Sequence, residues 1–480
     1  MNAPQPSTTL RLEPRDRADP LADATIAAIV GDWGLVAAAA TREQALAGHA
    51  PQWRRITAVN QLLGQWATNA AIDTWPGDAS SAEPEVIAPL RQYLQAAKGL
   101  PEWADPVRLQ RAETIFMEYG PLSCTLLFCA SLPECYVVPD LAAVLHVAGQ
   151  LEQHTEYRIR ATAAMIFPVM MKGGLSSPEG GGVAQILKVR LIHAMIRNLI
   201  LRGDPAQVSP GRAVPALAAM QGSTAMHHAM FAQGWNTDAN GLPCNQEELA
   251  YTLLTFGYVF LRGMRRLGQG LSPADEEAYL HIWNVVGHVL GIERALMPQT
   301  MDEAQAQFAR LQLQGRAQPL VTDRTRVSAA DPRPALGQAL MQVMAGVIPW
   351  RVVKPFPVLL TRYLCGHQTA RDLGLTSWIS WLSRALFALV MFITRAIDAT
   401  VRLFVPGFSI SRFVTRVLGY EFITQLLLDQ TRPLQLPAHV LNRVDDAMDQ
   451  WHSDPKAPRW MNRLEGRLTT RGRVGRRRRP

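Results

Sequence analysis

Hydrophobic residues recur every three or four positions over most of this 480-residue chain, which is the period of an α-helix. No long segment alternates apolar and polar residues as a half-buried strand does, and no internal repeat is visible. The pattern therefore predicts an all-α fold built as a single large helical domain. The expected helices span residues 24–40, 54–71, 89–98, 107–119, 121–130, 139–150, 157–171, 185–201, 245–267, 274–292, 336–347, 350–364 and 376–404.

Polar caps and turn residues mark several of the expected boundaries. Asp23 is expected as the N-cap of the first helix. Ser272 precedes Pro273 and a run of acids, which favours a helix start at that point. The segment KGGLSSPEGGG at 172–182 predicts a break, and residues 202–242, with their glycines and prolines, predict a polar linker. We expect residues 1–20 to be a flexible lead-in.

The expected helix QILKVRLIHAMIRNLIL, residues 185–201, is apolar nearly all the way round, which predicts burial. Yet Arg190, His193 and Arg197 lie at i, i+3 and i+7 and so share one side. Either that side faces water, or the cationic triplet is held inside the protein. We favour the second alternative. Two neighbouring arginines keep an imidazole neutral, the form that binds a metal or a haem iron. The arginines would suit the carboxylates of a haem.

The preceding expected helix carries a second candidate feature. Arg158 and Thr162 lie at i and i+4, and apolar residues follow them on the same side. A charged donor and a hydroxyl in an apolar wall suit the polar end of a hydrophobic pocket. The alternative is an arginine in water and a threonine bonded to its own helix. Spacing alone leaves both open.

The net charge of +8 is concentrated at the C-terminal end. Residues 456–480 contain Lys456 and nine arginines against Glu465, a sum of +9, so the remaining chain carries +8 − 9 = −1. We therefore expect a nearly neutral helical domain over 21–455 and a disordered arginine-rich tail over 456–480. Such a tail could contact nucleic acid or an anionic membrane.

Cysteine usage and hydropathy bear on the compartment. The five cysteines form no CxxC pair, so neither a zinc site nor a disulfide framework is expected. The first residues lack the apolar core of a secretory signal, and no run reaches roughly 18 apolar residues. We expect a cytoplasmic protein that can associate peripherally with a membrane. The helix at 376–404, with arginines and Trp378 and Trp381, could lie on a membrane surface or pack as a core helix with a solvated stripe.

The two candidate stretches together resemble one family. Arg158 with Thr162, followed about thirty residues later by KVRLIHAMIR, resemble the haem-binding core of the latex clearing proteins (rubber oxygenases) and of the fungal endoplasmic-reticulum oxygenase of mycophenolic acid biosynthesis. The resemblance covers roughly residues 100–298 and, more loosely, the later helices. It also rests on LPEWADPVRLQRAETIFMEYG, SLPECYVVPDLAAVL, GLPCNQEELAYTLLTFGYVFLRGMRRLG and YLHIWNVVGHVLGIERALMP.

That resemblance implies an all-helical fold holding one haem b non-covalently, with His193 as the proximal iron ligand. Arg190 and Arg197 would be cofactor-binding residues beside it. The implied activity is haem-dependent oxygenation of a lipophilic or polyisoprenoid-like substrate by dioxygen. Oxidative cleavage of a C=C bond is the candidate reaction.

The distal side departs from the family. The family pattern RxxKT is matched by Arg158 and Thr162, which the resemblance implies as catalytic residues, but Ala161 stands where the lysine would be. If that lysine occupies the distal iron position in the resting family enzymes, this chain must leave the position open or fill it otherwise. The family's distal glutamate has no match.

Two other classes of function stay open at this point. The chain could be a non-catalytic helical haem- or lipid-binding protein, with the missing lysine as a sign of lost activity. It could instead be an interaction protein anchored to anionic membrane or nucleic acid through its arginine tail.

Overall fold

The computed structural model describes residues 13–34, 41–75, 84–139, 141–144, 155–207, 212–220, 225–317, 321–323, 326–327, 331–346, 348 and 350–402. Helices dominate these residues, and the predicted all-α fold is confirmed. The described strands form two small antiparallel pairs, β1 (Ala213–Val214) with β2 (Trp235–Asn236) and β3 (Val321–Asp323) with β4 (Arg326–Val327).

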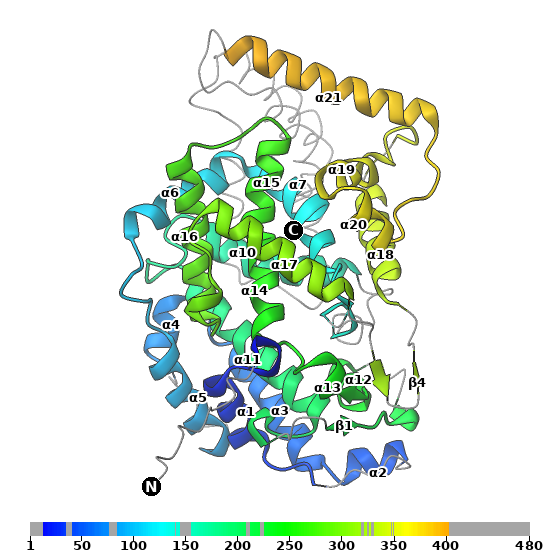
Figure 1. Ribbon diagram of the computed structural model, residues 1–480. Helices are drawn as coiled ribbons and strands as arrows, with labels where there is room; N and C mark the ends of the chain where they lie inside the picture. Colours follow the sequence, from blue (N-terminus) through cyan, green and yellow to red (C-terminus); the bar gives the residue numbers. More distant parts are fainter. Residues whose placement is uncertain are drawn as a thin grey trace, which may run out of the picture.

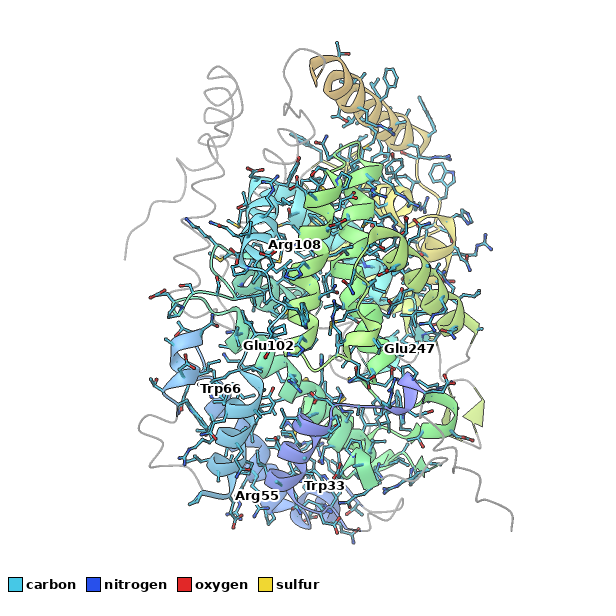
Figure 2. All side chains as sticks on the ribbon, turned by 60° about the vertical axis from the view of Figure 1, so that its left-hand side comes forward. Trp33, Arg55, Trp66, Glu102, Arg108 and Glu247 are labelled. Atoms are coloured by element: carbon cyan, nitrogen blue, oxygen red, sulfur yellow. The ribbon has the colours of Figure 1, made fainter. Side chains whose placement is uncertain are left out.

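The N-terminal helices gather at one end of the molecule (Figure 1). An aromatic cluster there joins Trp33 to Trp53, His49 and Phe231. The indole N–H of Trp33, labelled in Figure 2, donates to Oδ1 of Asn198 at 2.8 Å, which ties this end to the centre of the molecule. The helices of this group are α1 (Pro20–Val30), α2 (Arg42–Ala47), α3 (Ala50–Leu63), α4 (Asn69–Asp73) and α5 (Pro84–Ala97).

Helix α11 (Gly182–Leu201) lies in the central part of the molecule and packs against α1, α10, α12 and α16 (Figure 1). Its apolar residues are buried on several sides, as an all-round apolar helix requires. The other central helices are α6 (Pro106–Glu118), α7 (Gly120–Leu126), α8 (Leu132–Cys135), α10 (Thr155–Met170), α12 (Met226–Ala232), α13 (Thr237–Asn240), α14 (Gln246–Phe256), α15 (Tyr258–Arg266), α16 (Pro273–Val289) and α17 (Met301–Ala317).

The last described helices are α18 (Arg333–Gly346), α19 (Phe356–Cys365), α20 (His367–Asp372) and α21 (Trp381–Arg402). Figure 1 shows α21 lying across the end of the molecule opposite the N-terminal helices. Over the described residues, no single helix combines the length and apolar character needed to cross a bilayer. Within the same described residues, one pair of helices, 106–118 with 122–135, passes by length and composition together, and it is bent by 89°.

Two boundary predictions need correction. The first helix begins at Pro20, not after Asp23, because the Asp19 carboxylate accepts the Ala22 N–H and the proline suits the first turn. Residues 13–20, expected within a flexible lead-in, are built into the structure, since Asp19 is buried. Ser272 caps α16 with Pro273 in its first turn, as predicted.

The prediction of a polar linker at 202–242 also needs correction. Its described residues form α12, α13 and the β1–β2 pair, and they bury Phe231 and Trp235. Phe231 lies in α12 and Trp235 in β2, and these elements are too short to give a clear period in the sequence, so the pattern did not predict their burial. All five cysteines are free, in agreement with the expected absence of a disulfide framework. The arginine tail and most of the predicted helix 139–150 lie outside the described residues.

Candidate functional site

The N-terminus of α11 is fixed by a glycine turn and by a side chain from another helix. At Gly174 a Cβ would lie 2.2 Å from the Pro168 carbonyl oxygen, so only glycine permits this close passage from α10 to α11. Oδ1 of Asn69 accepts the N–H groups of Val183 at 3.1 Å and Ala184 at 3.3 Å. A helix N-terminus leaves such N–H groups without intrahelical partners, so Asn69 stabilises the start of α11.

Arg190 of α11 is buried in a bidentate ion pair with Asp19 beside the start of α1. Its Nε lies 2.5 Å from Oδ2 of Asp19 and its Nη2 lies 2.8 Å from Oδ1, while Nη1 donates to the Val289 carbonyl at 3.0 Å. Burial acts to lower the pKa of Arg190, but the hydrogen bonds and charge of Asp19 outweigh it and raise that pKa. Arg190 therefore stays protonated, and its hydrogen bonds join α1, α11 and the end of α16.

Arg197, two turns further along α11, forms a second buried pair with α1. Its Nε donates to Oδ1 of Asp23 at 2.7 Å, and Nη1 donates to the Cys244 carbonyl at 2.8 Å. Burial raises the pKa of Asp23 to about 6, against the opposing charge and hydrogen bond of Arg197. The carboxyl is thus mostly ionised at pH 7. We call these two pairs, Arg190–Asp19 and Arg197–Asp23, the carboxylate clamp.

His193 lies on the same side of α11, between the two arginines of the clamp. Its side chain is half-buried, and its Nδ1 atom is buried with no hydrogen-bond partner in the structure. Burial, helped by the nearby charge of Arg197, lowers the pKa of His193 to about 4. The imidazole is therefore neutral at pH 7, as the sequence predicted. The question posed by the sequence is answered for this helix: its cationic side faces inward.

The second candidate stretch lies on α10, which packs directly against α11. Arg158, Ala161 and Thr162 are all helical, and Thr162 is half-buried. The side chains of Arg158 and Ala161 lie outside the described part of the structure. The two helices that carry the candidate residues predicted from the sequence are therefore neighbours in the structure.

Sequence reasoning missed the two carboxylates of the clamp. A signal for them does exist: Asp19 and Asp23 lie at i and i+4, at the start of the apolar stretch ATIAAIV. Acids on the buried side of an apolar helix need partners of opposite charge. Arg190 and Arg197 are such partners, although more than 160 residues separate the two segments in sequence.

A second buried polar cluster surrounds Glu134 of α8, which is 1% exposed. Its Oε1 accepts from Nη2 of Arg262 at 2.5 Å, and its Oε2 accepts from Gln312 at 2.6 Å and from Thr369 at 3.1 Å. The carboxylate therefore joins α8, α15, α17 and α20. Because both carboxylate oxygens of Glu134 accept hydrogen bonds from protein side chains, we assign this cluster a structural role.

His193 of α11 is suited to bind a haem iron. Among the described residues, no group of three or more His, Cys, Asp or Glu side chains gathers in a metal-binding arrangement. One imidazole from the protein suffices to hold a haem iron, because the porphyrin supplies most of the other ligands. His193 has the required neutral form and a buried ring nitrogen without a partner, on a helix held by the carboxylate clamp.

The class of protein follows from comparison with known families. The family model for the catalytic domain of ER-bound oxygenase mpaB/B′ and rubber oxygenase matches residues 125–396, more than half of the chain. The chain therefore belongs to this family, as its sequence blocks predicted. The matched region contains α10 and α11 but not the clamp residues Asp19 and Asp23.

Individual relatives agree with this assignment. A rubber oxygenase from Streptomyces sp. (strain K30) is 26% identical over 330 residues, which are 67% of this chain and 66% of that protein. The aligned region thus spans slightly less than two thirds of the relative. The solved structure of latex clearing protein LCP in the closed state has the same fold, with a TM-score of 0.55, 19% identity and 92% coverage of each chain.

Proposed function

We propose that this protein is a haem b-dependent oxygenase that acts on a lipophilic, polyisoprenoid-like substrate. The observation that carries the proposal is His193, a neutral histidine with a buried, unpartnered ring nitrogen on a helix fixed by two ion pairs. Family membership supplies the reaction class, and the name of the Streptomyces relative supplies the substrate class.

His193 would hold the iron, and the haem when bound would supply a centre for binding and activating dioxygen. Arg190 and Arg197, predicted to bind the haem carboxylates, bind the carboxylates of Asp19 and Asp23. We therefore give them a positioning role: the carboxylate clamp fixes α11 and so fixes the imidazole. Burial, helped by the charge of Arg197, also keeps His193 unprotonated, as a ligand must be.

We assign the polar roles near the haem to α10, which packs against α11. Arg158 would donate hydrogen bonds and positive charge to the oxygen substrate, and Thr162 would donate within the same network. Ala161, in the position of the family lysine, offers no side chain that could bind iron. Dioxygen would then reach a bound haem without a lysine side chain at residue 161 competing for the iron.

The proposed reaction adds both atoms of dioxygen across a C=C bond. The C=C bond and the O=O bond break, two C=O bonds form, and two carbonyl products leave without an external reductant. The apolar residues that follow Thr162 along α10 suit the hydrocarbon, and the polar groups of α10 suit the reacting oxygen.

Oxygen uptake with emulsified polyisoprene or a shorter isoprenoid alkene tests this function. The haem-loaded protein should consume oxygen and form one pair of carbonyl groups for each molecule of dioxygen consumed. Thr162→Val should lower kcat with the haem content unchanged, whereas Thr114→Val, at an exposed position of α6, should change neither. A haem-loaded protein that consumes no oxygen with any such alkene would be the non-catalytic haem-binding protein instead.

A further inference from the structure

The helix α21 presents its apolar side to the surroundings and its small hydroxyl side chains to the protein. Ser383 is 3% exposed and Thr394 is 9% exposed, whereas Trp381 is 75% exposed and Phe392 is 71% exposed. Figure 2 shows side chains of this helix, rings among them, projecting away from the rest of the molecule. This orientation is the reverse of what a surface helix of a water-soluble protein normally shows.

The exposed apolar residues form one continuous stripe. They recur at i, i+1, i+4, i+8, i+11 and i+12, the spacing that places residues on one side of a helix. We call this set the apolar stripe: Trp381, Leu382, Ala385, Leu389, Phe392 and Ile393. Trp378, 83% exposed, precedes the helix and extends the same apolar character.

The charged residues around the apolar stripe indicate which kind of partner could cover it. Residues 331–402, which include all of α21, contain eight arginines and lysines and three acids. Two of these acids are already paired, Asp372 with Arg316 at 2.7 Å and Asp331 with Arg333 at 2.8 Å. The turn that carries the exposed Arg351 and Lys354 leads into Phe356, whose ring contacts Phe387 of α21 at 5.4 Å. The stripe therefore lies within a cationic surface.

An open groove lies at the base of the stripe, between α19 and α21. Its volume is about 470 Å³, and its lining is apolar except for one guanidinium group. The lining residues are Leu359, Trp381, Arg384, Ala385, Phe387 and Ala388. An apolar groove with an arginine at its side suits a lipid acyl chain with an anionic headgroup beside it.

We propose that α21 docks on an anionic lipid surface, with the apolar stripe inserted among the acyl chains and the arginines at the headgroups. A helix with aromatic and aliphatic residues on one side and flanking cations is the form that lies in a membrane interface. A second copy of the chain would set two cationic surfaces against each other. The proposal does not depend on the haem.

Vesicle sedimentation of the full-length protein tests the docking. Wild-type protein should bind vesicles of phosphatidylcholine with phosphatidylglycerol more tightly than vesicles of phosphatidylcholine alone, and salt should weaken the difference. Leu389→Gln with Phe392→Gln should lower the affinity roughly tenfold or more, since two inserted side chains are lost. Val107→Gln with Leu313→Gln, at positions 74% and 72% exposed elsewhere, should leave it unchanged.

The same variants separate the other outcomes. Binding that is equal in the wild type and in the Leu389→Gln, Phe392→Gln variant would place the lipid contact elsewhere, for example in the arginine tail, and overturn the proposal. Absence of vesicle binding would overturn it as well. In that case, a wild-type dimer that becomes monomeric in the variant would identify a second copy as the occupant.

Discussion

Replacing Asp19 by asparagine should destabilise the protein strongly, because Asp19 is 2% exposed and is the bidentate partner of Arg190. Asparagine keeps the size of the side chain and can still cap α1. It removes the charge that compensates the buried guanidinium. Removing one partner of a buried ion pair typically costs about 3–5 kcal/mol. Since asparagine still accepts one hydrogen bond, we expect the lower end, about 3 kcal/mol.

Urea unfolding followed by far-UV circular dichroism measures this cost. The matched control is Glu85→Gln, which breaks the exposed pair between Glu85 and Arg55 and should cost less than about 1 kcal/mol. The Asp19→Asn and Arg190→Met changes combined should cost less than the sum of the two single changes. If Asp19→Asn costs no more than Glu85→Gln, the carboxylate clamp does not hold α11 as described.

Two further predictions concern the same region. Between about pH 8 and pH 5 the wild type should lose about 2 kcal/mol more stability than His193→Gln. In this range the unfolded histidine, with its ordinary pKa of 6.5, takes up a proton, whereas the folded histidine, with a pKa of about 4, does not. Urea titrations at both pH values measure the loss of stability in each protein. Equal losses in the wild type and in His193→Gln would contradict this explanation. Gly291→Ala should cost about 2–4 kcal/mol, because its φ is +88° and a Cβ would lie 2.5 Å from Oδ2 of Asp19 and 2.7 Å from Nε of Arg190. Gly268→Ala has a similar φ of +75° but open space around it, so thermal unfolding should show a clearly smaller loss, and equal losses would exclude the steric explanation.

Much of the helical fold could be predicted because its signals are local. The apolar period identified α11 to within three residues at its start, and the Ser272–Pro273 signal identified the start of α16. The start of α1 was misplaced by four residues because two acids could each serve as a cap. Pro20 decides between them, since a proline suits the first turn of a helix.

The candidate site was predictable only in part, for a physical reason. The residues that carry its chemistry, His193 with its two arginines, are on one helix and share one side by simple periodicity. The partners of the arginines come from the far N-terminal part of the chain, and an ion pair between distant segments has no local pattern. The inward direction of the cationic side therefore needed the structure, which shows Arg197 fully buried beside Asp23.

The orientation of α21 was beyond the sequence for a related reason. Its pattern is amphipathic, and the two alternatives, a membrane-surface helix and a core helix with a solvated stripe, have the same period. Only the packing against α19 shows that Ser383 and Thr394 face the protein and that the apolar stripe does not. Periodicity identifies the two sides of a helix, but contacts decide which side is covered.

The central claim, that His193 holds a haem iron, is tested most directly by absorption spectroscopy during titration with haem. The wild-type protein should bind one haem and show a Soret band typical of histidine-ligated iron. His193→Ala should lose or shift that band, and added imidazole should restore it. His288→Ala, at an exposed position of α16, should leave it unchanged. A wild-type protein that takes up no haem, or a His193→Ala variant with an unaltered spectrum, would contradict the assignment.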